Sequence, residues 1–235
     1  MIPDFKYRSP DLEHLDVGDY TPEEYEGCIS ELKWINRFLG DARALKKSLI
    51  RAIEHSGARQ FSVLDVGAGS GELLRVIFEW AREGDRRGVL TGLELNERSA
   101  SAIAVDAKEC AEISAVRGSA LELPFADRSF DYALCSLFIH HFTDDLVIKI
   151  LQEMRRVARM NVFVIDLHRS ATAYVLYKIV AKFFLRNRLT REDGALSIRR
   201  SFLPDELLTL ARKAGMNNAQ IQSFFPFRLV LTLLK

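Results

Sequence analysis

The sequence predicts an α/β fold in which a mostly parallel, doubly wound sheet of seven strands carries helices on both faces. Short apolar runs alternate with helical patterns from residue 61 onward, which is typical of βαβ units. The chain has 235 residues, 48% of them hydrophobic, so it can bury one large core. No internal repeat or low-complexity tract interrupts the alternation.

Two helices are predicted before the sheet begins. The motif Thr-Pro-Glu-Glu at residues 21–24 supplies an N-cap, a proline at the first helical position and a capping-box glutamate. Gly40 can end this helix, and a second one should run over residues 41–57. We therefore expect residues 1–58 to form a helical cap and residues 59–235 to form the main domain.

Strands and helices then follow in turn along the chain. The predicted strands cover residues 61–66, 89–94, 113–117, 132–136, 162–167, 219–224 and 227–233. Helices are predicted near residues 97–109, 144–159 and 204–214.

Charge and cysteine content exclude several classes of protein. The formal net charge is +1, which gives no reason to expect a nucleic-acid surface. Cys28, Cys110 and Cys135 are odd in number and lack ligand-like spacing, so we expect neither a disulfide framework nor a metal site. A reducing cytoplasm is the simplest setting. No stretch has the pattern of a signal peptide or a membrane-spanning helix.

The segment from Asp65 to Gly71, with the sequence Asp-Val-Gly-Ala-Gly-Ser-Gly, carries the first piece of chemistry. Here an apolar strand runs into three closely spaced glycines and then into a helical pattern. Glycine permits positive φ and lacks the Cβ that would block a ligand lying against the backbone. The free N–H groups at the start of the next helix favour a carboxylate or phosphate. An ordinary tight turn would also explain the glycines, so other motifs must support a ligand site.

Glu94 supplies that support, because it ends the next predicted strand, 23 residues beyond Gly71. Doubly wound folds use an acidic residue in this place to bind the two hydroxyls of a ribose, although Glu94 could simply cap the following helix. An NAD-dependent oxidoreductase is the alternative, but its fingerprint is G-x-G-x-x-G/A. Counting from Gly67, the sixth position is Glu72, whose bulk would crowd the helix against the strand.

Taken together, these motifs resemble the class I S-adenosylmethionine-dependent methyltransferases. The likeness covers roughly residues 61–167 and includes the glycine turn 65–71, Glu94 and the stretches 118–125 and 129–141. It looks like the small-molecule branch that includes quinone and phenolic-lipid methylases. The resemblance implies a Rossmann-like methyltransferase fold closed by a C-terminal antiparallel hairpin, with S-adenosylmethionine as the cofactor.

The resemblance also implies where the cofactor lies. The glycine turn would surround its methionine portion, Glu94 would hold the ribose and Leu95 would lie against the adenine. The family often has an acidic residue in the place of Ser119, so this sequence departs from the family there. Ser136 and Leu137 would face the sulfonium. The implied cofactor-binding residues are Asp65, Gly67, Ala68, Gly69, Gly71, Glu94, Leu95, Ser119, Ala120, Ser136 and Leu137.

Three histidines are candidate catalytic residues. Methyl transfer mainly requires a nucleophile aligned with the methyl group, but a phenolic acceptor would also gain from a base. His140 and His141 follow the fourth predicted strand and His168 follows the fifth, at the edge where doubly wound folds bind ligands. One of the first two could instead pack against the next helix. Asp166 and Arg169 are expected to shape the site.

Residues 169–200 are predicted to form a basic amphipathic lid inserted after the fifth strand. They contain eight basic residues against two acidic ones. Such a segment could cover an apolar acceptor, rest on anionic lipid or pack on the core, and we favour the first. The apolar stripe expected to face the acceptor contains Val175, Leu176, Ile179, Val180, Phe183 and Phe184.

The sequence therefore predicts a methyltransferase acting on a hydrophobic small molecule, at a phenolic or quinol oxygen or carbon. A non-catalytic cofactor-binding partner subunit is an alternative, as is the oxidoreductase. We expect no nucleic-acid partner, because the Asn-Pro-Pro-aromatic pattern of amino-methylating relatives is absent after the fourth strand. Peripheral contact with a membrane and the oligomeric state are left open.

Overall fold

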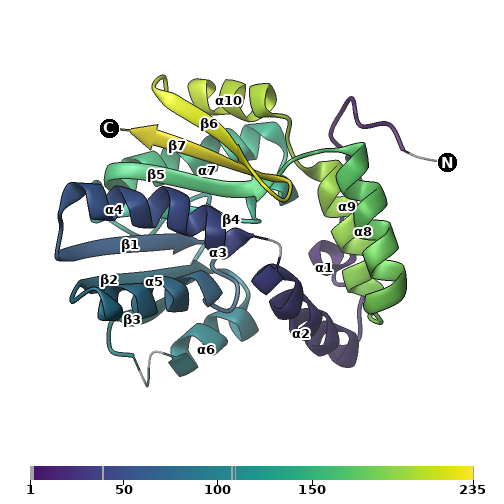
Figure 1. The fold of residues 1–235 in the computed structure, drawn as a ribbon, viewed down its shortest axis with the longest axis horizontal. Coiled ribbons are helices and arrows are strands. Elements are labelled where there is room, and N and C mark those ends of the chain that lie inside the picture. The colour runs from purple at the N-terminus through teal and green to yellow at the C-terminus, as the bar shows by residue number, and fades with distance from the viewer. Residues whose placement is uncertain (1–2, 39, 107, 109, 235) are drawn as a thin grey trace.

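All seven predicted strands are present in one sheet of the computed structural model, which describes residues 3–38, 40–106, 108 and 110–234 (Figure 1). The strands are β1 (Gln60–Val66), β2 (Arg87–Glu94), β3 (Ile113–Arg117), β4 (Phe130–Ser136), β5 (Ala158–Leu167), β6 (Ala219–Phe224) and β7 (Arg228–Leu234). Their order in space is β3-β2-β1-β4-β5-β7-β6. Strands β1 to β5 pair in parallel, and β7 pairs antiparallel with both β5 and β6. This confirms the doubly wound sheet and its C-terminal hairpin.

The helices cover both faces of the sheet and the carboxyl ends of its parallel strands. Before β2 lie α1 (His14–Val17), α2 (Pro22–Phe38), α3 (Asp41–Leu45), the π-helical turn η1 (Lys46–Ile50), α4 (Arg51–Ser56) and α5 (Glu72–Glu83). After β2 follow α6 (Glu97–Asp106), the 3-10 turn η2 (Ile139–His141), α7 (Asp144–Val157), α8 (Ala171–Phe184), α9 (Arg188–Arg200) and α10 (Pro204–Lys213). The predicted end of the sixth helix at Glu109 lies outside the described residues.

The central strands are apolar along their whole length because both faces are buried. In β1, Val63 joins the cluster beneath α3 to α6, whereas its neighbour Leu64 joins the cluster beneath α7 and α10. Alternate side chains of a strand point to opposite faces, so a strand covered on both sides reads as a continuous hydrophobic run. These two clusters are the main core.

The second predicted helix is present as one continuous unit, Asp41 to Ser56, with a π-helical turn in its middle. Its residues Leu45, Leu49 and Ile53 are fully buried in the same cluster as the β1 side chain Val63. This unit therefore packs on the sheet. The division of the chain into a cap of residues 1–58 and a main domain stays a prediction.

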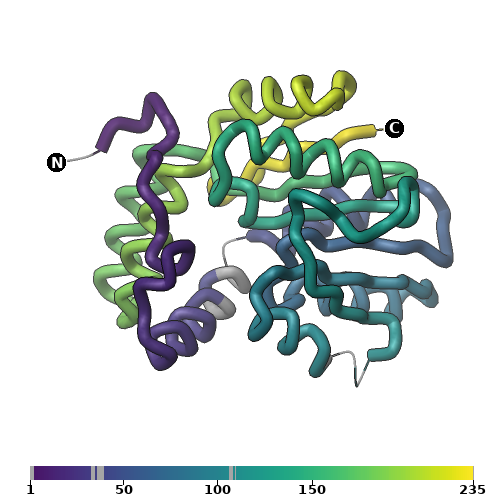
Figure 2. The backbone as a smooth tube through the Cα atoms, turned by 180° about the vertical axis from the view of Figure 1, so that it is seen from behind, coloured from purple at the N-terminus to yellow at the C-terminus, as the bar shows by residue number. Residues whose placement is uncertain are grey.

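A separate group of helices, α1, α2, α8 and α9, lies beyond the carboxyl ends of the parallel strands (Figure 1). The N-terminal strap, defined here as residues 3–13, runs beside these helices and is the part of the purple stretch nearest the label N in Figure 2. Arg169 donates from Nε to the carbonyl of Phe5 at 2.9 Å, and the Ser9 N–H donates to the carbonyl of Arg199 at 3.0 Å. Among the described residues, every helix is too short or too polar to cross a bilayer.

Candidate active site

A cavity of about 950 Å³ lies between the carboxyl ends of β1, β4 and β5 and the helices α2, α8 and α9. All three candidate histidines line it. Six of the predicted cofactor residues also line it, namely Asp65, Gly67, Ala68, Gly69, Ser136 and Leu137. The other five, Gly71, Glu94, Leu95, Ser119 and Ala120, lie outside this lining. The structure thus brings the strand ends together as expected of a doubly wound fold.

All three glycines of the turn after β1 have positive φ, and two of them show how the turn is packed. Gly67 has φ 71°, and a Cβ there would lie 2.3 Å from the ring of Phe138. Gly69 has φ 56°, and a Cβ there would meet no atom within 4 Å, so the backbone faces open space. The Gly67 N–H donates to the carbonyl of Leu93 at 2.9 Å, which ties the turn to β2. The turn therefore leaves room for a ligand over Gly69.

Glu94 joins this turn to the end of β2. Its Oε2 accepts the Gly69 N–H at 3.0 Å, and its Oε1 accepts the N–H groups of Leu95 at 2.9 Å and Asn96 at 3.0 Å. Asn96 rather than Glu94 caps the following helix, because Asn96 Oδ1 accepts the N–H groups of Arg98 at 3.0 Å and Ser99 at 3.2 Å. Because each carboxylate oxygen can accept two hydrogen bonds, Oε2 of Glu94 can accept one more. Leu95 is 65% exposed beside it.

Asp65 is a buried carboxylate that lines the cavity. It is 2% exposed, and its Oδ1 has no hydrogen-bond partner among the described residues. Burial and then the nearby carboxylates of Glu94 and Glu72 raise the pKa of Asp65 to about 7. A cationic group in the cavity would favour the charged form of this carboxylate and satisfy its free oxygen.

An Asp65→Asn variant should be more stable than the parent protein at alkaline pH. Because the folded-state pKa of Asp65 lies above the usual value for aspartate, ionisation opposes folding as the pH rises from about 4 to about 7. Each pH unit in that interval costs up to about 1.4 kcal/mol. Thermal unfolding followed by circular dichroism should show a gain in Tm at pH 8 that shrinks at pH 5. Equal gains at both pH values would contradict this account.

His140 is held by a buried aspartate at the ends of two neighbouring strands. It lies in η2 after β4, is 2% exposed, and its Nδ1 lies 2.7 Å from Oδ1 of Asp166 in β5. Burial alone would raise the pKa of Asp166, but the charge and hydrogen bond of His140 outweigh it and lower that pKa. Asp166 is therefore ionised and accepts the Nδ1 proton, which leaves His140 Nε2 free to face other groups.

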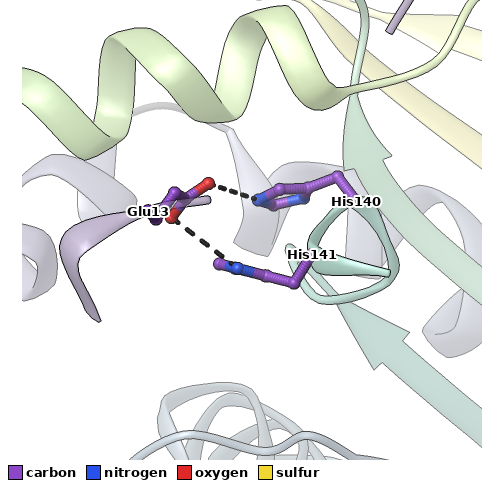
Figure 3. Close-up of side chains that lie close together, drawn as sticks. All are labelled: Glu13, His140 and His141. Carbon is purple, nitrogen blue, oxygen red and sulfur yellow. Dashed lines mark ion pairs between the residues drawn. The ribbon is translucent and has the colours of Figure 1, made fainter. Parts of the chain in front are cut away.

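Glu13 of the N-terminal strap completes this cluster (Figure 3). Its Oε1 lies 3.9 Å from Nε2 of His140, and its Oε2 lies 3.7 Å from Nδ1 of His141. The same His141 nitrogen lies 2.9 Å from Oδ1 of Asp16. Burial raises the pKa of Glu13 to about 7, although His141 and a hydrogen bond from the Ser197 hydroxyl at 2.8 Å partly oppose the rise.

Sequence reasoning missed Glu13 because nothing local marks it. It is one of several acids in the N-terminal segment, and it reaches the site only because arginines fix the strap across the fold. Arg8 donates to the carbonyls of His140 at 3.0 Å and Phe142 at 2.9 Å, and Arg200 donates to the carbonyl of Asp11. These contacts join segments more than 130 residues apart in the sequence.

His168 lies on a different wall of the cavity, between β5 and α8. Burial and the charge of Arg169 lower the pKa of His168, so its neutral form dominates near neutral pH. The guanidinium of Arg169 binds Glu206 and the carbonyls of Phe5 and Ser201, so this side chain ties the N-terminal strap to the segment before α10.

The apolar stripe of α8 is oriented differently from the prediction. Leu176 and Val180 line the cavity, but Phe183 and Phe184 are 71% and 68% exposed and lie outside its lining. The reason is that a different face of α8, the one that carries Tyr177, packs on α9. Tyr177 lies so close to Gly194 of α9 that a Cβ on Gly194 would overlap the tyrosine side chain. The large stripe residues at the end of α8 therefore point outward.

The geometry fits the amino-acid end of S-adenosylmethionine. Asp65 offers a free buried oxygen to a cationic amine, and open space lies over Gly69. A strand, a glycine turn and a helix, with an acidic residue ending the next strand, define an α/β protein that binds a nucleoside cofactor.

Comparison with known proteins gives the family. Residues 63–161 match the family described as "Methyltransferase domain". The demethylmenaquinone methyltransferase of Bacillus cereus is 29% identical over 223 residues, which cover 89% of each chain. That of Bacillus velezensis is 30% identical over 175 residues, which cover 68% of this chain and 73% of the relative.

Solved structures share the fold. A SAM dependent methyltransferase from Aquifex aeolicus matches with a TM-score of 0.55 and 14% identity, covering 85% of this chain and 96% of that chain. Magnesium protoporphyrin IX methyltransferase from Synechocystis PCC 6803, with bound SAH, has a TM-score of 0.57, 13% identity and 84% coverage of both chains. The chain belongs to the class I S-adenosylmethionine-dependent methyltransferases. S-adenosylmethionine is therefore its cofactor, and the oxidoreductase alternative is set aside.

Proposed function

We propose that this methyltransferase acts on a hydrophobic aromatic acceptor, at a phenolic or quinol oxygen or at a carbon of the same ring. The observation that carries the proposal is that His140, which is bound to the buried Asp166, lines a largely apolar cavity. The names of the two Bacillus relatives, both demethylmenaquinone methyltransferases, support an acceptor of this class.

The walls of the cavity suit an apolar molecule. Helix α2 contributes Leu32 and Ile35, and α8 contributes Leu176 and Val180. Removing apolar surface from water is worth about 25 cal/mol per Å², so a ring with a hydrocarbon tail gains from this surface. We assign residues 169–200 the role of a lid over such an acceptor.

We assign cofactor binding to the residues predicted from the sequence. Asp65 and the turn Gly67 to Gly71 would hold the amino-acid end, Glu94 the ribose, and Leu95, Ser119 and Ala120 the adenine. Ser136 and Leu137 would lie near the sulfur. When bound, S-adenosylmethionine supplies an electrophilic methyl group on a sulfonium.

The chain's own contribution is alignment and loss of the acceptor proton. Alignment of two reacting groups can be worth an effective molarity of about 10⁵ M or more. An acceptor hydroxyl must also lose its proton, and His140 is the residue best placed to help. Asp166 holds Nδ1, so Nε2 is free either to take up that proton or to hold a cation that draws it off.

A test of this function uses purified protein and S-adenosylmethionine with a labelled methyl group. The acceptor panel contains a short-chain demethylmenaquinol, an alkylphenol, a hydrophilic catechol and transfer RNA. We expect label in the apolar aromatic acceptors only. Cofactor binding by calorimetry without label in any acceptor would favour the non-catalytic partner subunit, and label in RNA would overturn the acceptor class.

A Leu176→Ser, Val180→Ser double variant should raise the KM for the acceptor by about tenfold or more, because each apolar side chain contributes on the order of 1–2 kcal/mol of contact. The KM for S-adenosylmethionine should change less than twofold. The matched control is Phe183→Ser with Phe184→Ser on the same helix, outside the cavity lining. A larger effect from the control pair would argue against α8 as a lid over the acceptor.

We also place the protein in the cytoplasm. Cys28, Cys110 and Cys135 are all free thiols, which suits a reducing compartment. Fractionation of cells followed by detection of the protein with an antibody would test this location and show any peripheral association with membranes.

A further inference from the structure

Glu13, His140 and His141 form a cluster, although the proposed methyl transfer requires only His140 among them. One oxygen or nitrogen atom from each side chain lies within 4.8 Å of the others, and all three side chains line the cavity. Two of the three come from adjacent positions after β4, and the third comes from the N-terminal strap (Figure 3).

We propose that Glu13, His140 and His141 bind one divalent transition-metal ion, of which Zn²⁺ is the expected example. Two imidazole nitrogens and a carboxylate oxygen form a donor set that suits Zn²⁺ and its first-row neighbours. Binding itself does not depend on the proposed function, whereas a role for the ion in methyl transfer rests on it.

The distances between the donor atoms are longer than those that a bound metal requires. Ligand bonds of about 2.0–2.2 Å in a tetrahedral site place neighbouring donor atoms about 3.4 Å apart. Two different Glu13 oxygens lie 3.9 Å from His140 Nε2 and 3.7 Å from His141 Nδ1, and one donor atom from each of the three side chains lies within 4.8 Å of the others. The side chains would therefore have to approach one another by up to about 1.4 Å to close around an ion. At His141, the ion would take the place of the proton shared with Asp16.

The surroundings of His140 are those of a metal-ligating histidine. Its Nδ1 is bound to a fully buried carboxylate, Asp166, which fixes the tautomer and directs Nε2 at Glu13. Histidine ligands commonly donate their second nitrogen to a carboxylate in this way, and loss of that partner weakens metal binding about 10–100-fold.

The local charge also favours a divalent cation. Glu13, Asp16 and Asp166 face the cluster as carboxylates, and Arg200 is the cation that contacts two of them, at 4.0 Å from Glu13 and 3.8 Å from Asp16. Asp193 adds a carboxylate that faces Glu13, and Arg8 adds a cation that faces Asp166, so four acidic side chains surround the cluster against two basic ones. A divalent cation would reduce this excess.

Three protein ligands leave a fourth position, which is the mark of a catalytic rather than a structural zinc site. Because all three ligands line the acceptor cavity, this position would face the acceptor. A cation there would attract an acceptor oxygen and lower the pKa of its hydroxyl, which is the role that the proposed function requires.

The test is metal binding by the full-length protein after treatment with a chelator. Equilibrium dialysis against Zn²⁺ with elemental analysis gives the stoichiometry and Kd, and Co²⁺ gives a visible spectrum that reports nitrogen and oxygen ligands. We expect one equivalent of Zn²⁺ and binding at least about 100-fold weaker in Glu13→Gln and in His141→Asn. Asp166→Asn should weaken binding about 10–100-fold.

The matched control is His55→Gln, because His55 is an exposed histidine in α4 whose Nδ1 contacts the carbonyl of Arg51. It should bind Zn²⁺ like the parent.

Parent protein that binds no more Zn²⁺ than both ligand variants would overturn the proposal. Normal circular dichroism of His141→Asn would show that misfolding is not the cause of weaker binding. Chelator-treated protein that methylates a quinol at the full rate would exclude a role for the metal but leave the proposed function intact. Metal binding without any methylated acceptor would support the metal site and overturn the proposed function.

Discussion

A His140→Ala variant should lose methyl transfer to a hydroxyl acceptor by about 10²–10⁴-fold, the range expected when proton transfer is no longer assisted. Its affinity for S-adenosylmethionine should stay within about twofold of the parent, because His140 is held by Asp166 whereas the glycine turn is held by Glu94. The measurement is kcat with labelled cofactor beside Kd from calorimetry. His140→Gln serves as a second variant that fills the buried space.

Single His141→Ala and His168→Ala variants give the comparison. We expect a smaller loss for His141, which is partly exposed, and the smallest for His168, which lies on the other wall of the cavity. Full activity in all three single variants would show that alignment alone carries the reaction. A loss of cofactor affinity equal to the loss of rate would instead place His140 in the cofactor site.

The Gly69→Ala change should weaken S-adenosylmethionine binding by about 10–100-fold. Its Cβ would enter the space over the turn that we assign to the cofactor, and overfilling a packed contact costs about 1–3 kcal/mol. The protein without cofactor should still fold, because no atom lies within 4 Å of that Cβ, but its Tm should be lower because Gly69 has a positive φ. Calorimetric Kd and Tm without cofactor are the two measurements.

The matched control for this change is Gly57→Ala. Gly57 also has a positive φ, 68°, and open space around its Cβ, but it lies at the end of α4 and outside the cavity lining. Both variants carry the same backbone strain of about 1–2 kcal/mol, so their Tm values should fall alike. Equal cofactor affinity in the two variants would remove the glycine turn from the cofactor site.

The parts of the fold that depend on local pattern were predictable from the sequence. Two strand ends can be identified without reference to the rest of the chain. The first follows from the apolar run before Asp65 and the three glycines after it, and the second from the acidic residue at position 94. The placement of β7 between β5 and β6 is a matter of long-range pairing, and only the resemblance to a family predicted the hairpin. The π-helical turn at residues 46–50 has no sequence signal that we can name.

The candidate site divides in the same way. The histidines could be found because they follow strand ends, where doubly wound folds gather their functional groups. Glu13 could not, since its segment is brought to the site by contacts with residues far along the sequence, such as those of Arg8, Arg169 and Arg200. The outward direction of Phe183 and Phe184 also escaped prediction, because an apolar stripe does not reveal which neighbour covers it.

The course of the N-terminal strap has a consequence for how the protein is made. Residues 3–13 are translated before all of the partners that hold them, which include the carbonyls of His140 and Phe142 and the later Arg169, Arg199 and Arg200. The strap can therefore make its full set of contacts only after residue 200 has been translated. Nascent chains stalled before residue 140 should accordingly remain sensitive to protease over residues 3–13.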